Sequence, residues 1–445
     1  MKVSQAQRVT VIGTGYLGIT HAVCMAELGH DVLGLDIDRD KVERLSSGGP
    51  PIFEPGLEPL LRKHVESRRL RFTTSYEAAG EFGDVHFVCV GTPQRPDSGS
   101  ADTSQVETAI GALAPHLTRR CLVVGKSTVP VGTAKRLEGT LQAAAPAGTS
   151  AELAWNPEFL REGYGIEDTL RPNRLVFGVR SAWSERVLWS VFAPIIDIGT
   201  PVVTADFATA ELIKTAANSF LATKISFINA MAELCEAAGG DVTLLAEALG
   251  YDERIGRPFL NAGLGFGGGC LPKDIRAFQA QAAELGIPEA LDLLRCVDAI
   301  NDRRRLRAVA LAAKQLGGTV ANRRITVLGA SFKPNSDDIR DSPALAVAMA
   351  LRDAGAEVTV HDPEAIPNTL TAHPDLSGLT DLVAAVSGAE LLILATEWSQ
   401  YAELEPEWLG PMTDGRRILD ARNALAPERW RAAGWEYRAL GRYGE

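Results

Sequence analysis

A cysteine in a glycine-rich loop is the side chain whose surroundings most favour chemistry. Cys270 lies in the segment Gly265-Phe266-Gly267-Gly268-Gly269-Cys270-Leu271-Pro272-Lys273-Asp274, and a helical pattern begins just after it. A thiol at a helix N-terminus and next to Lys273 is biased toward the thiolate, which is the nucleophilic form. The sequence contains no CxxC pair, so neither a disulfide framework nor a zinc site is expected. We interpret the other five cysteines as small buried apolar residues: Cys24, Cys89, Cys121, Cys235 and Cys296.

Lys214 and Asn218 are four residues apart in a helical pattern and therefore share one helix face. Their neighbours Ala210, Ala217 and Leu221 make that face mostly apolar. An ammonium and an amide on a half-buried face can stabilise an oxyanion or an alkoxide. On spacing alone, a solvated helix face remains the alternative interpretation.

Two polar segments follow strand-like runs. One is Asn156-Pro157-Glu158-Phe159-Leu160-Arg161-Glu162-Gly163, which carries two carboxylates four residues apart, and the other is Lys126-Ser127-Thr128-Val129-Pro130-Val131-Gly132-Thr133. Loops at the carboxyl ends of parallel strands are where an α/β fold places its sites. For both segments, a functional loop and a merely structural loop remain equally open.

The segment Gly13-Thr14-Gly15-Tyr16-Leu17-Gly18 follows a short β-branched strand and opens a helix. In this GxGxxG pattern Gly13 permits a tight turn, Gly15 lets the backbone approach a pyrophosphate, and Gly18 allows close helix packing. Asp36 closes the second strand, 23 residues after Gly13, where it can accept hydrogen bonds from a ribose diol. Because an acid disfavours a 2′-phosphate, the pattern predicts NAD in preference to NADP. The alternative is a glycine turn that binds nothing.

A parallel sheet is the element that can position these residues. Residues 8–36 read as one βαβ unit, with a helix over 19–28 and a second strand over 31–35. Strand-like runs at 85–90, 122–125 and 175–179 are separated by helical stretches. This alternation predicts an α/β fold with a doubly wound parallel sheet.

A long helix follows the sheet pattern. Residues 205–238 contain no glycine or proline, and apolar residues recur at three- and four-residue spacing. A helix over this segment is roughly 50 Å long at 1.5 Å per residue. Because that exceeds one small domain, we expect it to bridge two domains or to form a dimer interface. A further helical stretch over 273–316 is interrupted at Gly286-Ile287-Pro288.

The opening pattern then returns in degenerate form. The segment 324–329 repeats 8–13, and 355–362 repeats 29–36, but the second copy is ten residues longer between these anchors and lacks the dinucleotide glycines. The extra residues fall in the loop around Lys333, which we expect to supply charge toward phosphates. The sequence thus predicts two Rossmann-like doubly wound domains joined by a long central helix and a helical connector, with boundaries at 1–204, 205–318 and 319–445.

Composition narrows the function classes. The 445 residues suggest about three domains, and the net charge of −11 argues against binding to nucleic acid or to an anionic membrane. We expect no membrane span and no signal peptide, and hence a cytoplasmic protein. The run Arg303-Arg304-Arg305-Leu306-Arg307 is interpreted as a solvated or inter-subunit helix face and not as a nucleic-acid site.

Seven ordered motifs together resemble the UDP-glucose 6-dehydrogenase family of nucleotide-sugar dehydrogenases over nearly the whole chain. They are the Gly13 loop, Gly91-Thr92-Pro93, residues 126–132, 156–163 and 214–218, the Cys270 loop and residues 332–340. The resemblance implies oxidation of a sugar C6 alcohol to a carboxylate in two hydride transfers, with two NAD and one water. It also implies two Rossmann-like domains around a long helix, and a homodimer formed through that helix.

The resemblance also implies roles for individual residues. Cys270 matches the nucleophile that forms a thiohemiacetal and then a thioester, Lys214 and Asn218 match groups that stabilise the oxyanion, Asp274 and Thr128 match groups around an ordered water, and Glu158 matches the acid–base residue of hydrolysis. Matches to cofactor contacts are Gly13, Gly15, Tyr16, Leu17, Gly18, Asp36, Lys41, Thr92, Thr128, Glu162, Lys273 and Arg340. Matches to substrate contacts are Glu158, Phe159, Leu160, Arg161, Glu162, Lys214, Asn218, Arg254, Phe259, Leu260, Asn261, Ala262, Gly263, Gly267, Lys333 and Arg422, and the match of Arg254 implies reach into the partner subunit's site.

The sequence departs from the family pattern at a few positions. Gly269 and Leu271 stand where the family commonly has serine and phenylalanine, and leucine there also occurs in relatives that resemble GDP-mannose dehydrogenases. Lys273 argues against the N-acetylmannosamine branch, which usually lacks this lysine. Lys41 stands where some relatives have arginine near the adenosine ribose, so the charge is kept.

Several functions therefore stay open at this point. The leading hypothesis is a four-electron oxidation of UDP-glucose to UDP-glucuronic acid, and the same chemistry on dTDP-glucose or GDP-mannose is the nearest alternative. A two-electron dehydrogenase that does not use the cysteine is another. A catalytically silent NAD-binding protein is an alternative from a different class, although such a protein would have no chemical need for Cys270, Lys214, Asn218 and Asp274 together.

Overall fold

The computed structural model describes residues 6–442 of the chain. It divides into two compact units, each with its own sheet. The first unit comprises the chain up to Ala217 together with Arg276–Gly286, and the second comprises Asn218–Ile275 and the chain from Ile287 onward. The predicted three-part division at 204 and 318 stays a prediction.

The first unit contains an eight-stranded sheet with the order β3-β2-β1-β4-β5-β6-β7-β8. All neighbouring pairs are parallel except β6 and β7, which pair antiparallel through Trp155 and Gly178. The prediction of a parallel sheet is therefore wrong for the strand predicted at 175–179, and the strand after it, which is parallel to it, was not predicted. An antiparallel neighbour needs no crossover helix against the sheet, and β6 and β7 are joined by a loop that carries one short helix. The strands are β1 (Arg8–Ile12), β2 (Asp31–Leu35), β3 (Leu70–Thr73), β4 (Val85–Val88), β5 (Cys121–Gly125), β6 (Ala151–Trp155), β7 (Leu175–Gly178) and β8 (Val202–Ala205).

Helices cover both faces of the first sheet because the buried strands are apolar on both faces. Val9, Val11 and Phe87 pack with α1, α3 and α8 on one face, whereas Ile12 and Val88 pack with α4, α5 and α6 on the other. The helices are α1 (Tyr16–Glu27), α2 (Arg39–Ser46), α3 (Leu57–Glu66), α4 (Tyr76–Phe82), α5 (Ser104–Leu113), α6 (Thr133–Ala144), α7 (Gly165–Leu170), α8 (Ala182–Val191) and α9 (Ala193–Asp197), with 3₁₀ turns at Ala114–His116 and Gly148–Ser150.

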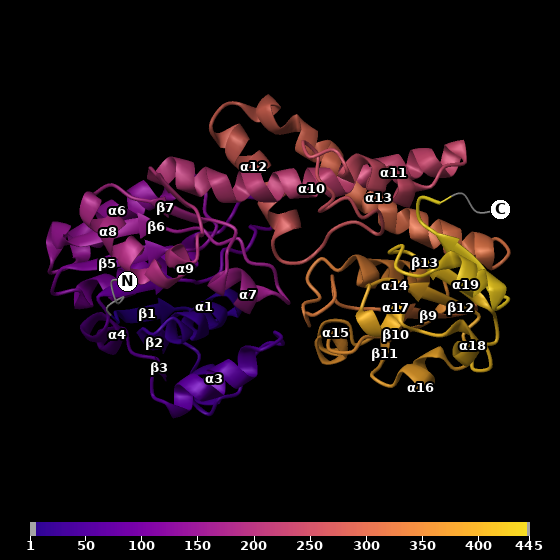
Figure 1. The fold of residues 1–445 in the computed structure, drawn as a ribbon, viewed down its shortest axis with the longest axis horizontal. Helices are drawn as coiled ribbons and strands as arrows, with labels where there is room; N and C mark the ends of the chain where they lie inside the picture. Colours follow the sequence, from indigo (N-terminus) through magenta and orange to yellow (C-terminus); the bar gives the residue numbers. More distant parts are fainter. Residues whose placement is uncertain (1–5, 443–445) are drawn as a thin grey trace. The chain divides into compact units, whose positions relative to one another are not determined.

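The second unit contains a six-stranded, wholly parallel sheet with the order β11-β10-β9-β12-β13-β14. This order repeats that of β3 to β6 in the first sheet, so the predicted second Rossmann-like copy is confirmed. In Figure 1 it is the orange-to-yellow part of the chain. Its elements are β9 (Arg324–Leu328), α14 (Pro343–Asp353), β10 (Glu357–His361), α15 (Ile366–Ala372), β11 (Ser377–Leu379), α16 (Leu382–Val386), β12 (Leu391–Leu394), α17 (Ser399–Ala402), α18 (Pro406–Leu409), β13 (Arg417–Asp420), α19 (Pro427–Ala432) and β14 (Glu436–Ala439).

The predicted long helix is α10 (Phe207–Ala238), which is 32 residues long and joins the two units. It starts two residues later than predicted. It is followed by α11 (Val242–Gly250), α12 (Leu271–Glu284), a 3₁₀ turn at Pro288–Leu291 and α13 (Asp292–Gln315). The interruption predicted at 286–288 is confirmed, and Gly286 there has φ +77°.

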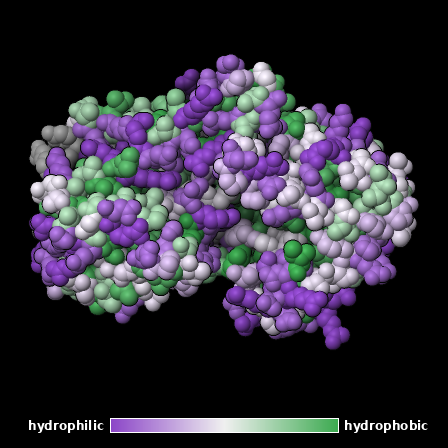
Figure 2. All heavy atoms as spheres, turned by 180° about the vertical axis from the view of Figure 1, so that it is seen from behind, coloured by the Kyte–Doolittle hydropathy of each residue, from purple (hydrophilic) through white to green (hydrophobic). Residues whose placement is uncertain are grey.

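Within residues 6–442, the structure has no helix whose length and apolar character would allow it to cross a membrane. Figure 2 shows one face of the molecule, on which hydrophilic and hydrophobic residues are interspersed.

Candidate active site

The glycine turn between β1 and α1 has the geometry that its sequence predicts. Gly13 has φ +86°, and its N–H donates to the carbonyl of Leu35 over 2.8 Å. A Cβ on Gly18 would lie 1.7 Å from the carbonyl oxygen of Gly13, whereas a Cβ on Gly15 would meet nothing within 4 Å. No side chain caps the first turn of α1. Open backbone N–H groups at a helix N-terminus form a site that suits a pyrophosphate.

Asp36 lies beside this turn as a tightly held carboxylate. Its Oδ2 accepts hydrogen bonds from the Thr14 N–H (2.9 Å), the Thr14 hydroxyl (2.7 Å) and Lys41 Nζ (3.1 Å), and its Oδ1 accepts one from the Asp38 N–H (3.1 Å). Burial acts to raise the pKa of Asp36, but the hydrogen bonds from Thr14, Asp38 and Lys41 outweigh it and leave the pKa below its ordinary value. An ionised acid at this position repels a 2′-phosphate, which agrees with a preference for NAD.

Glu158 and Lys214, predicted from different segments, form an ion pair in the first unit, in which Lys214 is buried and Glu158 is partly buried. Lys214 Nζ lies 2.8 Å from Glu158 Oε1, and the Leu160 N–H donates to Glu158 Oε2 over 2.7 Å. A second acid on α10 fixes this part of the helix, because Glu211 accepts from the N–H groups of Gly132 (2.7 Å) and Ala134 (2.6 Å) at the start of α6. The result is a rigid ammonium–carboxylate pair at the loop after β6.

The remaining predicted residues of the first unit differ in their surroundings. Thr92 is buried after β4, and Thr128 is half-buried in the loop after β5. The guanidinium of Arg161 pairs with Asp168 of α7 over 2.8 Å, so its side chain turns toward that helix.

Asn218 and Asp274 come together in the second unit, as the cluster of predicted catalytic residues requires. Asn218 Nδ2 donates to Asp274 Oδ2 over 2.6 Å, and Lys273 Nζ donates to Asp274 Oδ1 over 2.7 Å. Both Asn218 and Asp274 are buried. The Asp274 carboxylate is therefore fixed by an amide and an ammonium four residues after Cys270.

Cys270 is exposed at the residue just before α12, where the prediction places a nucleophile. The loop that leads to it is held from several sides. Asn301 accepts from the Phe266 N–H (2.8 Å) and donates to the Phe266 carbonyl (3.0 Å), and the Gly268 N–H donates to the Arg340 carbonyl (2.9 Å). The thiol thus stands at a helix start on a loop of fixed backbone.

Two glycines of this loop are closely approached by neighbouring groups. A Cβ on Gly267 would lie 2.3 Å from the carbonyl oxygen of Asp341, and one on Gly269 would lie 2.4 Å from Arg340 Cζ. The guanidinium of Arg340 therefore takes the space that a side chain at 269 would need. This packing gives the departure from the common serine at 269 a physical reason.

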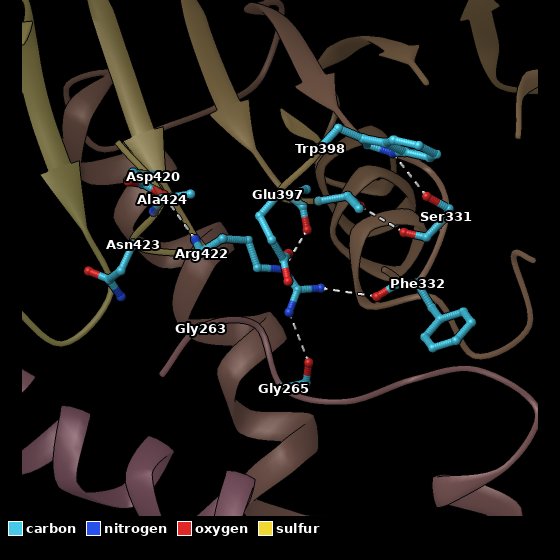
Figure 3. A network of polar contacts seen from close by, with 12 residues as sticks. Gly263, Gly265, Ser331, Phe332, Glu397, Trp398, Asp420, Arg422, Asn423 and Ala424 are labelled. Atoms are coloured by element: carbon cyan, nitrogen blue, oxygen red, sulfur yellow. Dashed lines mark hydrogen bonds and ion pairs between the residues drawn. The ribbon is translucent and has the colours of Figure 1, made fainter. Parts of the chain in front are cut away.

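Arg422, one of the predicted substrate residues, is held by several polar contacts. Figure 3 shows its guanidinium between loops of the second unit. It donates to the carbonyls of Ala395 (2.7 Å), Gly265 (3.1 Å) and Phe332 (3.4 Å), and Nε lies 3.3 Å from Glu397 Oε2. Arg422 thus ties the Cys270 loop to the second sheet. Lys333 lies beside this network, with Nζ 5.3 Å from the centre of the Phe332 ring.

The segment 259–263 is only partly suited to contact a substrate through its side chains. Phe259 has φ +66°, a strained value for a residue other than glycine. Leu260 and Ala262 are buried in the core formed with α10 and α11, so only their backbone groups are placed to meet a ligand. The side chain of Arg254 is exposed and pairs with Asp252 over 2.6 Å.

Two interpretations made from the sequence are wrong: that of Arg304 within the arginine run, although Arg303 and Arg307 are exposed, and that of Cys296. Arg304 is not on a solvated face but is 0 % exposed, with Glu236 at 3.7 Å and Glu233 at 4.0 Å from its guanidinium. Cys296 is exposed and not buried, because Leu294 and Val297 form the buried face of α13 and 296 falls off that face.

The second unit keeps the glycine turn of the repeat, but the aspartate that corresponds to Asp36 is buried. Gly329, with φ +118°, matches Gly13, and Asp362 matches Asp36. The carboxylate of Asp362 accepts from the N–H groups of Ala330 (2.7 Å) and Ser331 (3.0 Å) and from Trp398 Nε1 (3.2 Å). Asp362 is fully buried, so it is not available to a ribose.

Sequence reasoning missed Glu54, which fixes the loop that carries Glu158 and Glu162. Glu54 is 5 % exposed. It accepts hydrogen bonds from the N–H groups of Gly163 and Gly165, each over 2.7 Å, and from the Tyr16 hydroxyl. Nothing within the segment around 54 signals this role, because its partners are more than 35 residues away in either direction.

Lys126 was also missed as an individual residue. It is buried, and its Nζ donates to Asn156 Oδ1 over 2.8 Å. Burial lowers the pKa of Lys126 to about 8. It joins the ends of β5 and β6, where two of the predicted loops begin.

Models of three consecutive parts of one protein family match the chain. They are described as the NAD binding domain (residues 7–196), the central domain (208–303) and the UDP binding domain (326–427) of the UDP-glucose/GDP-mannose dehydrogenase family. The first model covers β1 to β7 of the first sheet and ends before β8, and the third begins within β9 of the second sheet, extends past β13 and ends before β14.

Individual relatives match over nearly their full length. The UDP-glucose 6-dehydrogenase of Rhizobium meliloti is 41% identical over 98% of this chain and 99% of its own length. TuaD, a UDP-glucose 6-dehydrogenase of Bacillus subtilis, is 39% identical over 98% and 93%. A solved UDP-glucose dehydrogenase from Pyrobaculum islandicum has a TM-score of 0.90 at 38% identity and covers 99% of both chains. The chain therefore belongs to the UDP-glucose/GDP-mannose dehydrogenase family.

Proposed function

We propose that the chain oxidises the C6 alcohol of UDP-glucose to the carboxylate of UDP-glucuronic acid with two NAD and one water. The main observation behind this proposal is that Cys270 is exposed just before α12. Relatives of about 40% identity that match over nearly their full length are UDP-glucose 6-dehydrogenases. In each oxidation NAD accepts a hydride. The overall reaction turns one alcohol and one water into a carboxylate, two NADH and three protons.

The residues of the NAD-binding domain fit the cofactor. The turn at Gly15 leaves open space beside unsatisfied N–H groups of α1, which suits the pyrophosphate. Asp36 is held at the end of β2, where the adenosine ribose of a dinucleotide binds in this fold. Lys41, Thr92, Glu162, Lys273 and Arg340 are proposed as further cofactor contacts.

Cys270 gives the second oxidation a carbon that still carries hydrogen. In the first oxidation the C6 alcohol loses a hydride and a proton and becomes an aldehyde. The thiolate then adds to the carbonyl carbon, and the oxygen takes up a proton to give a thiohemiacetal. Loss of a second hydride and of the hydroxyl proton gives a thioester. Water attacks the thioester, the C–S bond breaks, and the thiolate leaves as the carboxylate forms.

The polar residues are proposed to stabilise the oxyanion and to position and deprotonate the water in these steps. We assign Lys214 and Asn218 to the oxyanion, since an ammonium and an amide are the donors that it needs. Asp274 and Thr128 are assigned to the water that attacks the thioester, and Glu158 to its deprotonation. Glu158 Oε1 lies 2.8 Å from Lys214 Nζ, so the proposed base is next to one of the groups assigned to the oxyanion.

The substrate side is assigned to the second unit and to the loop after β6. Lys333 and Arg422 are proposed to contact the nucleotide diphosphate, and the backbone of 259–263 is proposed to contact the substrate. UDP-glucose is favoured because the relatives named above, at about 40% identity, are UDP-glucose dehydrogenases, whereas a GDP-mannose dehydrogenase from Pseudomonas aeruginosa is only 26% identical. Uracil and thymine differ by one methyl, worth about 1 kcal/mol in a pocket, so dTDP-glucose is the closest competitor in a panel of initial rates.

Product stoichiometry tests the reaction. We expect two NADH and one acid per UDP-glucose consumed, measured by absorbance and by chromatography of the nucleotide sugar. One NADH with release of an aldehyde would show a two-electron dehydrogenase, and no NADH at all would show a silent NAD-binding protein.

Two exposed cysteines provide a matched test of the nucleophile. Cys270→Ser should stop the reaction before the thioester forms and leave enzyme-bound or released aldehyde. Cys296→Ser, which alters the other exposed thiol, should turn over normally. Normal turnover in Cys270→Ser would refute the assignment.

We also propose that the protein forms a homodimer through α10. Phe220, Phe227 and Leu234 recur every seven residues on this helix and are 66%, 48% and 60% exposed. Seven-residue spacing places them on one face, and a second copy of the same helix would cover that face. Light scattering should show a dimer, and a double variant Phe227→Glu and Leu234→Glu should be monomeric. A monomeric unmodified protein would refute the proposal.

A further inference from the structure

A small cavity in the second unit gathers five cationic side chains. It encloses about 130 Å³ beside α13, α19 and the edge strand β14. Arg307, Lys314, Arg431, Arg438 and Arg442 line it together with one acid, Glu236. Five cations and one carboxylate give a formal charge of +4, in a chain whose net charge is −11.

The lone acid is already used by the fold. Glu236 Oε2 pairs with Arg307 over 2.7 Å, and its Oε1 accepts from the Gly441 N–H over 2.8 Å. The buried guanidinium of Arg304 lies 3.7 Å from the same carboxylate. Glu236 therefore cannot neutralise the other cations of the cavity.

Those cations have little other compensation. Among residues 6–442, Lys314 and Arg431 have no carboxylate within ion-pair distance, and Arg431 lies 5.6 Å from the centre of the Tyr437 ring. Arg438 is 3.5 Å from its carboxylate partner, a long separation for an ion pair. Arg442 is the better-paired one, at 3.2 Å from Asp241. Like charges held around one cavity repel one another unless an anion joins them.

Four of the five cations lie on helices or strands, and Arg442 forms an isolated β-bridge with Asp241. Arg307 and Lys314 are seven residues apart on α13 and share a face with Leu311. Arg438 lies on β14, and Arg431 lies on α19, the helix that precedes this strand. Arginine forks held in this way can bind phosphate oxygens in bidentate fashion.

We propose that this cavity binds the phosphate or diphosphate group of a small molecule. The clustered arginine side chains match the charge and the hydrogen-bond geometry of a phosphate group. None of the residues proposed for catalysis, cofactor or substrate lines it. The site is thus separate from the proposed reaction and does not depend on it.

Calorimetric titration of the full-length protein tests the site. The probes are orthophosphate, pyrophosphate and a nucleoside triphosphate, and the tightest of them identifies the class of ligand. We expect saturable binding that weakens at least tenfold in the double variant Lys314→Ala and Arg431→Ala. Arg429→Ala is the matched control, since Arg429 lies on the same helix α19 but pairs with Glu405 over 3.0 Å and is outside the cavity. The control should bind as the unmodified protein does.

The dehydrogenase assay separates this proposal from the proposed reaction. NAD and nucleotide sugars both carry a pyrophosphate, so their sites can also bind the probes, and this binding persists in the double variant. We expect the double variant to keep the KM and kcat of the unmodified protein without added probe, which shows that it is folded. Equal probe affinity in the double variant and the control, or no binding to the unmodified protein, overturns the proposal whether or not the chain is active.

Discussion

Glu54 offers a sharp test of how the fold holds the proposed acid–base loop. Its two carboxylate oxygens accept from the N–H groups of Gly163 and Gly165 and from the Tyr16 hydroxyl. The buried carboxylate therefore links the start of α1, in the glycine turn, to the end of the loop that carries Glu158 and Glu162. We expect Glu54→Gln to loosen that loop.

The size of the effect follows from the hydrogen bonds. The amide of Gln offers one acceptor oxygen, and its NH₂ group faces one of the two backbone N–H groups that the carboxylate held. Gly163 and Gly165 are both buried, and one unsatisfied buried donor costs about 1–3 kcal/mol. Since 1.4 kcal/mol is a factor of ten, kcat/KM for UDP-glucose should fall about tenfold to hundredfold, with the loss mainly in KM. Tyr16→Phe removes only the hydroxyl and should have a smaller effect.

Initial rates over a range of UDP-glucose concentrations, together with thermal unfolding, measure this prediction. Glu58→Gln is the control, because Glu58 is an exposed residue of the neighbouring helix α3 that pairs only with Arg62. If Glu54→Gln lowers the unfolding temperature but leaves kcat/KM unchanged, Glu54 stabilises the fold without positioning the loop, and the reasoning fails. An unchanged unfolding temperature and unchanged kinetics would refute the energetic argument as well.

Three further changes test other parts of the structure. Burial lowers the pKa of Lys126 to about 8, so the folded state loses this proton at a lower pH than the unfolded state, and the contribution of Lys126 to stability rises between about pH 8 and 10.5. In urea titrations, the difference in unfolding free energy between the unmodified protein and Lys126→Met should change by about 3 kcal/mol over that range. Arg304→Met should be within about 1 kcal/mol of the unmodified protein or more stable, whereas Glu236→Gln should cost about 3–5 kcal/mol because it leaves a buried guanidinium uncompensated; the reverse order in urea midpoints would contradict this. Gly269→Ser should displace Arg340 and raise the KM for NAD about fivefold, which corresponds to about 1 kcal/mol of side-chain rearrangement. An unchanged KM would show that Arg340 does not contact the cofactor.

Local patterns predicted those parts of the fold that local forces decide. The turn at Gly13 needs a positive φ and close packing that only glycine allows, so its spacing was readable in the sequence. The helix α10 was readable because a break-free run with helical periodicity has no competing structure. The second Rossmann-like sheet was found because the repeated strands kept both their apolar pattern and their closing acid.

Long-range contacts set the features that the sequence did not predict. The segment 175–179 reads as an ordinary strand, and its direction depends on how the chain returns after β6, whereas β8 was not predicted at all. The arginine run predicts a solvated position for Arg304, because three of its neighbours are also arginines. In the structure Arg304 is buried because Glu233 and Glu236 of α10 lie within ion-pair distance of its guanidinium. The role of Glu54 likewise depends on backbone groups more than 100 residues away.

Each repeat has one aspartate at the end of its second strand, and these two equivalent residues have different surroundings. Asp36 and Asp362 both accept hydrogen bonds from the glycine turn of their own unit. At Asp36 the further partner is Lys41, a flexible side chain that can move aside for a ribose. At Asp362 it is Trp398, a buried and rigid ring. The tryptophan comes from the loop between β12 and α17, outside the segments whose sequences repeat. A comparison of those segments therefore does not show that the second acid is covered. A dinucleotide can therefore use the acid of the first repeat only, and the second sheet keeps the acid as part of its core.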